Sequence, residues 1–512
     1  KKARWATVIV VVLLVAAAAA WPTSRAWALN LVGVRASADV TVLDGITKLP
    51  LRDVDVSIGG SQGRTNSQGE VSLGLVKLGT QQLRVRKRAF AVSYTSEHIG
   101  LGVNHLGTVN LRPAGDRYQL RAIDYVSGKP VAAAMAVAGD AEAIADKQGI
   151  ITLTISGVNA GDNVSFKAYV SADGYRTQPV NLTNAQSGVT TVQLVTTRPD
   201  VYFSNQSGKY DLYKSDIDGQ NKKLLVAGTG SETSSLSLLV HPSGAEAAFV
   251  DTRDGTHDSD GYLEQSLSLV NVSTGALTTI DHSDRIQLVD WVGDRIVYIK
   301  TKAGASAANP SRYQMLSYDY RINQRLTLDH ANAFNDVVST DGSIYYATSN
   351  QYDGGVSQFV SIHADATNRQ VLLNTEVWNI LRKDYDDFYL SSGNANYAYK
   401  LGDAKPTATN ETDNNPSRLY VDSPDGKHSL WVDQRDGKGV LLSYDLATQK
   451  DTVIAELPGI TYPVRWLSND TIIYRVKTYN ETADYVIGLS SNTSKKITDV
   501  TDASGKSLWY FY

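Results

Sequence analysis

The residues best suited to bind a metal ion lie in one acidic stretch. Residues 251–264 (DTRDGTHDSDGYLE) contain four Asp, one Glu and one His. Carboxylate oxygens are the ligands that Ca²⁺ prefers, so Asp254, Asp258 and Asp260 are candidate calcium ligands. The spacing does not follow an EF-hand loop, because with Asp258 and Asp260 at positions three and five the twelfth position is Leu267. A solvated loop between two strands is the alternative interpretation.

No other motif supplies a catalytic residue. Residues 59–63 (GGSQG) match G-x-S-x-G, but a nucleophile elbow needs a strand before it and a helix after it. The turn-rich RTNSQGEVSL follows here, so we expect a hairpin loop. The eight His are scattered without a metal-ligand spacing. The chain contains no Cys, which excludes disulfides and thiolate chemistry. We therefore predict no catalytic residue, and no cofactor besides the candidate calcium.

Four basic side chains follow one another closely in TQQLRVRKRAF (80–90), namely Arg84, Arg86, Lys87 and Arg88. A solvated strand face is one interpretation, and contact with anionic polymers of a cell envelope is the other. The whole chain has a formal net charge of −4 and gives no reason to expect nucleic acid as a partner.

Two segments read as small β-sandwiches, at 35–112 and 113–198. Short strand-like runs recur at roughly ten-residue spacing between Gly, Asn and Ser turns. The run DRYQLRAIDYVSGKPVAAAMAVAG (116–139) parallels ASADVTVLDGITKLPLRDVDVSIGG (36–60), and ADKQGIITL (145–153) parallels NSQGEVSL (66–73). With their turns that contain Lys and Pro (TKLP at 47–50 and SGKP at 127–130) and their Gln-Gly turns, both segments resemble carboxypeptidase-regulatory-like and PEGA-type modules. That resemblance implies spacers that carry no chemistry.

Internal repeats organise the remainder of the chain, 199–512. PSGAEAAFVDTRDG (242–255) aligns without a gap to PDGKHSLWVDQRDG (424–437), 182 residues later. Trp291 and Trp466 are 175 residues apart, and Trp378 lies midway between them. These spacings share a unit of about 44 residues, which is typical of a four-stranded propeller blade. The sequence therefore predicts a seven-bladed β-propeller.

The first unit of this propeller, at 200–226, has only three strand-like runs. We expect the C-terminal KSLWYFY (506–512) to supply its fourth strand, closing the ring and removing both exposed sheet edges. The Ser-Pro-Asp-Gly turn (423–426) and the Arg-Asp-Gly turns resemble those of TolB-like propellers and of the propellers of dipeptidyl-peptidase enzymes. The resemblance implies this fold and carries over no catalytic residue.

The N-terminal segment, 1–28, predicts a membrane anchor. Lys1, Lys2 and Arg4 precede an apolar run from Trp5 to Trp21, which is nearly long enough to cross a bilayer as a helix. The basic flank predicts a single-pass protein of the cytoplasmic membrane with its N-terminus inside and its bulk outside. Secretion after cleavage near Ala28 is the alternative.

Together these features predict an all-β protein with an N-terminal transmembrane helix, two small β-sandwiches and a seven-bladed β-propeller. We predict a membrane-tethered binding or scaffold protein that recognises an envelope protein or a glycan, and not an enzyme. The alternative is an extracytoplasmic hydrolase or lyase whose active site lies in the propeller funnel. The sequence does not bear on oligomeric state.

Overall fold

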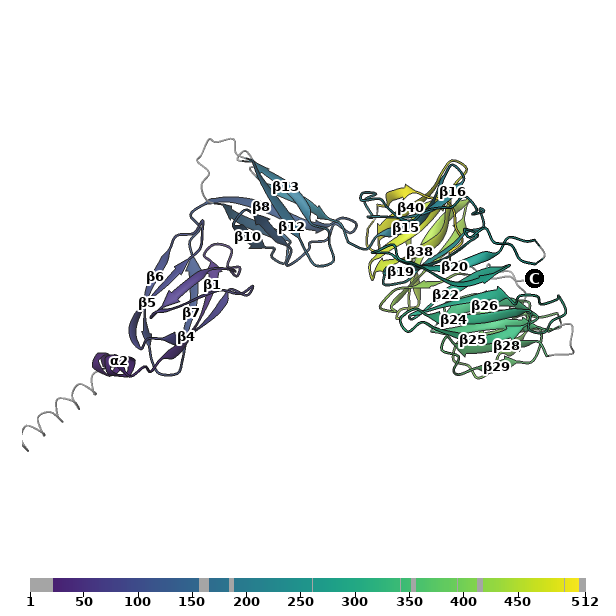
Figure 1. The fold of residues 1–512 in the computed structure, drawn as a ribbon, viewed down its shortest axis with the longest axis horizontal. Helices are drawn as coiled ribbons and strands as arrows, with labels where there is room; N and C mark the ends of the chain where they lie inside the picture. The colour runs from purple at the N-terminus through teal and green to yellow at the C-terminus, as the bar shows by residue number, and fades with distance from the viewer. Residues whose placement is uncertain are drawn as a thin grey trace, which may run out of the picture. The chain divides into compact units, whose positions relative to one another are not determined.

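The computed structural model describes residues 22–155, 165–183, 188–259, 261–340, 342–350, 356–393, 395–411, 418–491 and 493–505 of the chain. The chain divides into two compact units, Lys1–Leu194 and Val195–Tyr512. The described residues form 41 strands and one helix, so the predicted all-β class is confirmed (Figure 1).

The first unit consists of two small β-sandwiches. The strands of the first are β1 (Ala36–Asp44), β2 (Asp55–Ile58), β3 (Ser61–Arg64), β4 (Glu70–Val76), β5 (Gly79–Arg86), β6 (Ser93–Ile99) and β7 (Val103–Leu111), and those of the second are β8 (Asp116–Asp124), β9 (Met135–Ala138), β10 (Ala141–Ile144), β11 (Ile150–Ile155), β12 (Ser165–Ser171), β13 (Gln178–Thr183) and β14 (Val189–Leu194). The sheet orders are β4-β1-β7 and β3-β2-β5-β6 in the first, and β11-β8-β14 and β10-β9-β12-β13 in the second. Alternating residues of each strand fill the core, as in β1, where Val40 and Val42 are buried.

The two sandwiches share one topology, and from β1–β4 to β8–β11 equivalent positions are 80 residues apart. Asp44, the last residue of β1, accepts a hydrogen bond from the amide of Thr47 at 3.0 Å, and Asp124, the last residue of β8, accepts one from the amide of Ser127 at 2.7 Å. The Gln-Gly turns are equivalent too, with Gly149 at φ 76°. A Cβ on Gly149 would lie 2.4 Å from a carbonyl oxygen of β8, so the turn requires glycine.

The prediction of a single-pass membrane protein needs correction. The helix α2 (Pro22–Leu31) overlaps the segment assigned to the anchor, but Ala26 and Leu29 pack against the core of the first sandwich. The side chain of Asn30 binds both the amide and the carbonyl of Leu78, at 2.9 and 3.0 Å. Residues 22–28, including the expected cleavage position at Ala28, therefore belong to this sandwich.

No helix in the part of the chain that the structure describes has the length and hydrophobicity needed to cross a membrane. The apolar run from Trp5 to Trp21, on which the prediction of the anchor rested, lies outside the described residues.

The second unit is a β-propeller. Its described strands form seven antiparallel sheets in chain order, the first of three strands and the others of four. The strands are β15 (Asp200–Gln206), β16 (Lys209–Ser215), β17 (Lys223–Val226); β18 (Ser237–Val240), β19 (Glu246–Asp251), β20 (Gln265–Asn271), β21 (Leu277–Ser283); β22 (Ile286–Val292), β23 (Arg295–Thr301), β24 (Tyr313–Asp319), β25 (Gln324–Ala331); β26 (Ala333–Thr340), β27 (Ser343–Ser349), β28 (Gln358–His363), β29 (Gln370–Leu373); β30 (Asn379–Arg382), β31 (Asp387–Ser391), β32 (Asn396–Lys400), β33 (Thr407–Thr409); β34 (Val421–Asp422), β35 (His428–Arg435), β36 (Lys438–Asp445), β37 (Lys450–Leu457); and β38 (Ile460–Ser468), β39 (Thr471–Lys477), β40 (Thr482–Gly488), β41 (Lys495–Asp499).

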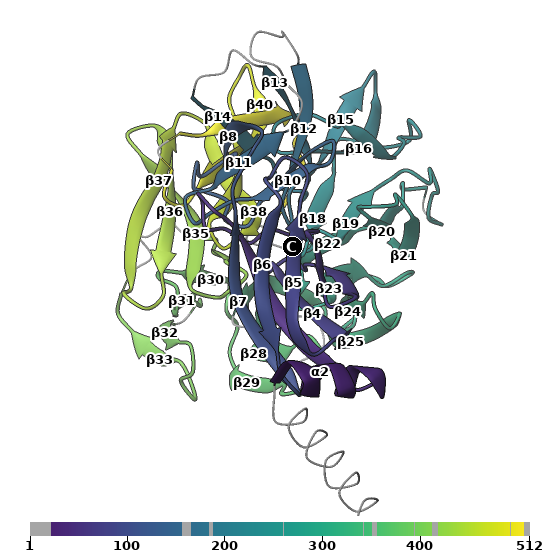
Figure 2. The same ribbon diagram turned by 90° about the vertical axis from the view of Figure 1, so that its left-hand side faces the viewer.

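The sheets surround a common centre (Figure 2). The first strands of neighbouring sheets contact one another, as β18 does with β22 and β22 with β26, so these strands line the axis. Each first strand leads through a short turn into the second strand of its sheet, and we call these connections the a–b turns. Examples are the turns HPSG (241–244) and SPDG (423–426).

The C-terminal segment joins the last sheet to the first. After β41, Thr501 pairs with Phe203 of β15, and its amide donates to the Phe203 carbonyl at 2.7 Å. Ser504 then pairs with Ser237 of β18, so residues 501–504 lie along the axis between the first two sheets. Residues 506–512, which the sequence assigns to this closing strand, lie outside the described residues.

Several second strands of the propeller carry a buried tyrosine. Tyr298, Tyr346, Tyr389 and Tyr474 are all nearly inaccessible. The Tyr298 hydroxyl donates to Asp281 of the preceding sheet at 2.8 Å, and the Tyr346 hydroxyl donates to Asp329. These bonds satisfy the hydroxyls and attach the outer strand of one sheet to the next sheet.

Candidate functional site

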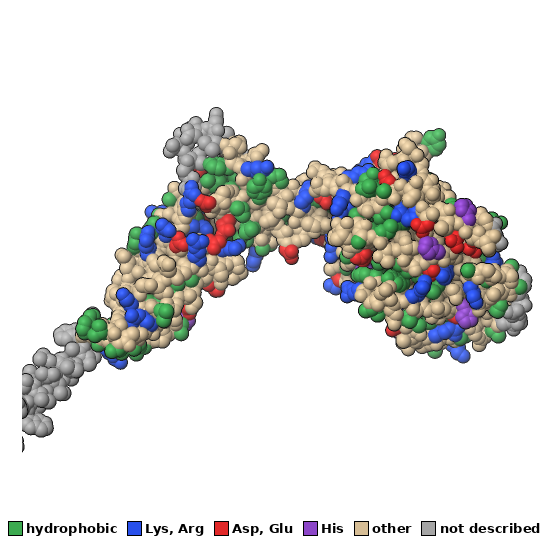
Figure 3. All heavy atoms as spheres, in the orientation of Figure 1, with side chains coloured by type: hydrophobic (Ala, Val, Ile, Leu, Met, Phe, Trp, Pro, Cys, Tyr) green, Lys and Arg blue, Asp and Glu red, His purple; other side chains and the backbone are tan. Residues whose placement is uncertain are grey.

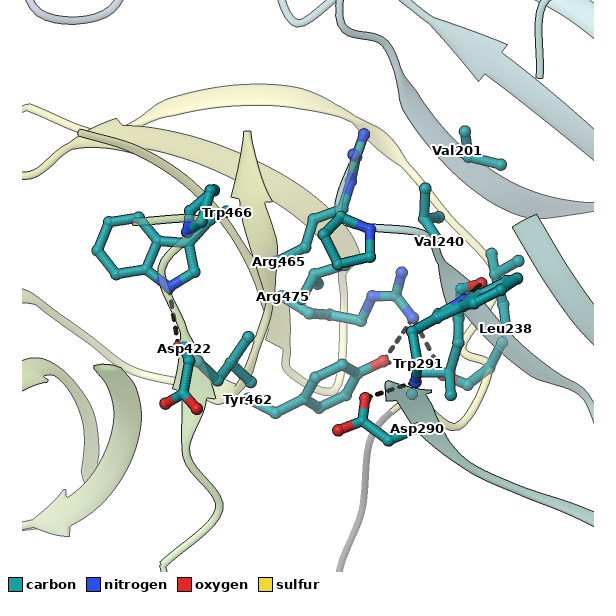
Figure 4. Close-up of a pocket in the computed structure, with 17 residues that line it drawn as sticks. Val201, Leu238, Val240, Asp290, Trp291, Asp422, Tyr462, Arg465, Trp466 and Arg475 are labelled. Atoms are coloured by element: carbon teal, nitrogen blue, oxygen red, sulfur yellow. Dashed lines mark hydrogen bonds between the residues drawn. The ribbon is translucent and has the colours of Figure 1, made fainter. Parts of the chain in front are cut away.

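A cavity of about 90 Å³ opens on the propeller axis (Figure 4). Its walls come from the first strands β18, β22, β34 and β38, from β39, and from the C-terminal segment around Ala503 and Gly505. Most of the lining is apolar, and residues of the a–b turns, Pro242 and Pro424, are exposed at its mouth. The cavity therefore faces the a–b turns.

Two tryptophans in the cavity wall tie neighbouring sheets together. The indole N–H of Trp291 donates to the Leu239 carbonyl at 2.9 Å, and that of Trp466 donates to the Val421 carbonyl at 2.8 Å. Both rings are buried. They therefore serve the packing between blades, with no indole N–H left to bind a ligand.

Trp378, the third tryptophan of the repeat, is 38% exposed and does not make this contact. At this junction Val377 is buried instead, and its carbonyl accepts a hydrogen bond from the side chain of Asn335 at 2.8 Å. Here the preceding sheet supplies the hydrogen-bond donor, Asn335. At Trp291 and Trp466 the preceding sheet supplies the acceptor.

We expect Trp466→Phe to destabilise the propeller by about 1–3 kcal/mol, because the Val421 carbonyl would lose its buried donor. Trp378→Phe is the matched control, with an expected change below about 0.5 kcal/mol at its half-exposed site. Urea unfolding of the full chain measures both. Equal losses of unfolding free energy in the two variants would contradict a stabilising role for the bond between Trp466 and the Val421 carbonyl.

A buried ion pair lies at the bottom of the cavity. Arg475 binds Asp484 through two bonds, Nε to Oδ1 at 2.7 Å and Nη2 to Oδ2 at 2.8 Å. Its Nη1 donates to the Tyr462 hydroxyl at 2.7 Å and to the Ala503 carbonyl at 3.3 Å. Tyr462 in turn donates to Ala503 at 2.9 Å. Arg475 thereby holds the closing segment, as the dashed lines in Figure 4 show.

Two further buried residues of opposite charge, Asp200 and Arg465, adjoin this cluster. Burial and the nearby Asp484 raise the pKa of Asp200 to about 7, with partial compensation from Arg465 and Arg475. Burial lowers the pKa of Arg465 to about 10, and its Nη2 donates to the Pro199 carbonyl. Asp200 does not line the cavity, whereas Arg465 does.

The carboxylates that do line the cavity are engaged in local bonds. Asp290 accepts from the amide of Trp291 at 2.8 Å. Asp422 accepts from the Ser429 hydroxyl at 2.5 Å and from the Tyr385 hydroxyl at 3.2 Å. Catalysis by an acid and a base would need two such groups poised toward a common substrate. Both carboxylates of the described lining are held by hydrogen bonds to neighbouring groups.

The candidate calcium residues take different partners. Asp254 accepts from the Ser266 hydroxyl and lies 3.6 Å from Nδ1 of His282. Asp258 accepts from the amide of Tyr262 at 2.8 Å, which shapes the local turn. Asp260 lies outside the described residues. Within the described ranges no group of three His, Asp or Glu is arranged for a metal ion, and calcium binding here stays a prediction.

The G-x-S-x-G segment forms the hairpin that the sequence predicts. β2 ends at Ile58, β3 begins at Ser61, and these two residues pair across the turn. Gly59 and Gly60 have φ of 54° and 86°, which a two-residue hairpin requires. Ser61 therefore lies in a strand and not in a nucleophile elbow.

Sequence reasoning missed the charged cluster under the cavity. Arg465, Arg475 and Asp484 lie within twenty positions of one another, but Asp200 lies 265 positions before Arg465, and the four follow no motif. The available signal was their position, since charged residues inside strongly apolar strand patterns such as TIIYRVK need a buried partner.

The comparisons with known proteins concern the fold. No protein-family model matches the chain, and no curated protein matches it. Among solved structures the chain is similar to TolB from Acinetobacter baumannii, at 12% identity over 60% of this chain and 82% of that one, with a TM-score of 0.33. It is also similar to the β-propeller domain of the Trilobed protease from Pyrococcus furiosus, at 10% identity over 59% and 94%, with a TM-score of 0.38.

A third similar structure is the acylaminoacyl peptidase of Pyrococcus horikoshii, at 10% identity over 59% of this chain and 52% of that one, with a TM-score of 0.36. TolB and peptidase propellers, which the sequence resembles, thus recur among the solved structures. The resemblance of the sandwiches to carboxypeptidase-regulatory-like and PEGA-type modules stays a prediction.

Proposed function

We propose that this chain is a binding or scaffold protein whose propeller recognises a partner, a protein or a glycan, at the axial cavity and the a–b turns around it. The cavity supports this function because its mouth is formed by apolar residues from several sheets. The charged groups below the cavity, Arg475 and Asp484, bind each other through two hydrogen bonds.

The size and chemistry of the cavity favour a protein partner. Pockets that enclose a small-molecule ligand measure roughly 300–1,000 Å³, whereas this cavity measures about 90 Å³. Such a volume suits one side chain projecting from a larger surface. An apolar anchor that enters a pocket while the surrounding surfaces exclude water is the usual centre of a protein interface.

Affinity capture with the full chain tests this proposal. We expect Pro242→Arg/Pro424→Arg to reduce recovery of a specific partner at least about tenfold, because two charges would stand at the apolar mouth. Thr278→Arg, exposed on the outer strand β21, is the control and should leave recovery unchanged. Undiminished recovery by the double variant would exclude the axial face as the binding surface.

One observation favours the alternative, a hydrolase or lyase. Asp200 has a pKa near neutrality beside a second carboxyl group, Asp484, which is the behaviour of a general acid. Its complete burial argues against that role, since the group does not reach the cavity. Turnover of a peptide or polysaccharide that is abolished by Asp200→Asn, without loss of folding, would establish the alternative.

A further inference from the structure

The outer surface of the sheet β3-β2-β5-β6 in the first sandwich carries a patch that we call the basic face. Its members are Asp55 and Ser57 on β2, Gln62 and Arg64 on β3, Arg84 and Arg86 on β5, and Tyr94 on β6. All except Tyr94 line one open groove of about 480 Å³. Basic side chains are visible over the first sandwich in Figure 3.

The strand register orders these side chains into two rows. Asp55 lies between Arg64 and Arg86 and accepts from each at 3.0 Å, and the bond from Arg86 is the main cause of its lowered pKa. Arg84 is the direct cross-strand partner of Ser57 on one side and of Tyr94 on the other. It makes no ion pair with any described residue, so one guanidinium group is available.

Lys87, which belongs to the same basic run in the sequence, does not contribute to the basic face. Lys87, the next residue after Arg86, is largely buried, and its ammonium group donates to the Arg52 carbonyl at 2.6 Å. The basic face therefore depends on the alternation of β5, which directs Arg84 and Arg86 outward while Leu83 and Val85 enter the core.

The second sandwich shows that the fold does not require these charges. In its equivalent sheet, β10-β9-β12-β13, the register places Met135 at the position of Asp55 and Ile144 at that of Arg64. Tyr169 and Ser171 occupy the positions of Arg84 and Arg86. Since the same sheet forms with apolar and neutral residues, the charges of the basic face call for another explanation.

We propose that the basic face binds a linear acidic polysaccharide. Arginine forks bind carboxylate, sulfate or phosphate groups in pairs of hydrogen bonds. Arg84 and Arg86 are two residues apart on one strand, about 7 Å, and Arg64 is two strands away from Arg86, about 10 Å. Arg64 and Arg86 converge on Asp55, and Arg84 stands apart from them on the same face, so the face suits anionic groups repeated along a chain better than a single anion.

The neutral side chains of the face favour a sugar over other polyanions. Ser57 and Gln62 place hydroxyl and amide groups between the arginines, where sugar hydroxyls would bind. Tyr94 is 55% exposed next to Arg84 and offers an aromatic surface for a sugar ring. No exposed aliphatic side chain of the kind that anchors a protein or lipid contact lines the groove.

Binding of the full chain to polygalacturonate and to heparin tests the proposal, with neutral dextran, polyglutamate and single-stranded DNA in parallel. We expect Arg64→Gln/Arg84→Gln/Arg86→Gln to weaken binding of at least one acidic polysaccharide by about tenfold or more, and added salt to weaken it as well. Arg121→Gln/Lys147→Gln/Lys167→Gln removes the same charge from the second sandwich and should change affinity less than about twofold.

Arg84→Gln alone separates recognition from folding. Arg84 has no ion pair to lose, so this variant should keep the wild-type melting temperature and still weaken binding about threefold. Equal losses in the two triple variants, no binding of either polysaccharide, or tighter binding of polyglutamate or DNA would each overturn the proposal.

Discussion

Replacing Arg475 by Met should destabilise the propeller by about 3–5 kcal/mol, because Asp484 would remain as a buried charge without its partner. The side chains of Arg475 and Asp484 are 4% and 0% exposed, so water cannot replace the lost bonds. The change also removes the donor that holds the Tyr462 hydroxyl and the Ala503 carbonyl. We therefore expect the closing segment to detach before the rest of the propeller unfolds.

Urea unfolding of the full chain measures the loss, and limited proteolysis near residues 501–504 reports the detachment. Lys477→Met on the same strand is the matched control. Lys477 pairs with Asp502 at the surface, so its loss should cost below about 1 kcal/mol. Arg475→Met/Asp484→Leu should recover much of the stability, because it leaves no buried charge unpaired. If the double variant is no more stable than Arg475→Met, the unpaired charge of Asp484 is not the cause of the lost stability.

Asp200→Asn should remove a large dependence of stability on pH. The pKa of Asp200 is about 7 in the folded protein and about 3.8 in the unfolded chain. The folded state therefore binds this proton more tightly. The resulting stabilisation is fully present below about pH 4 and is lost as the pH rises through about 7. Between pH 5 and pH 8 the stability of the wild type should fall, relative to the variant, by about 3 kcal/mol.

The charged groups around Asp200 are Asp484, Arg465 and Arg475, and Tyr202 packs beside them. Asparagine keeps the shape of the side chain but carries no charge, so the variant should be the more stable protein at pH 8. Asp436→Asn, on an exposed turn, is the control and should keep the wild-type pH dependence. Parallel stability curves for wild type and Asp200→Asn between pH 5 and pH 8 would rule out the raised pKa.

The propeller was predictable because each blade repeats the same physical requirements. Trp291 and Trp466 recur because both fill the same inter-blade position and bond to the preceding first strand. Trp378 matches them in spacing but lies one residue beyond the buried Val377. Spacing alone cannot detect such a shift, because it reverses the face of the strand on which a side chain lies.

The N-terminal prediction was wrong because hydrophobicity does not reveal a docking partner. Residues 22–28 (PTSRAWA) directly follow the apolar run from Trp5 to Trp21, and Ala26 among them packs on the first sandwich. Asn30 completes that contact through Leu78, 48 residues away in the chain. A contact of this range has no local sequence signature.

The two copies of the Asp-x-Arg sequence form the same local bond but differ in burial. In both copies the Arg Nε donates to the Asp two residues earlier, Arg253 to Asp251 at 3.1 Å and Arg435 to Asp433 at 2.9 Å. Side chains only two positions apart can bond whatever packs around them, so the sequence by itself determined the bond. The side chain of Arg253 is 6% exposed and that of Arg435 is 48% exposed.

The burial of such a pair depends on what packs over it. Glu232 and the Ala227 carbonyl cover Arg253, and both come from the connection between the first two sheets. The axial cluster shows the same dependence, since Arg475 gains its role only when the C-terminal segment returns to the first sheet. Strand pattern, turns and repeat length were therefore properties of the sequence. Burial, pKa and closure were decided by the tertiary structure, because they depend on how separate strands and connections pack against one another.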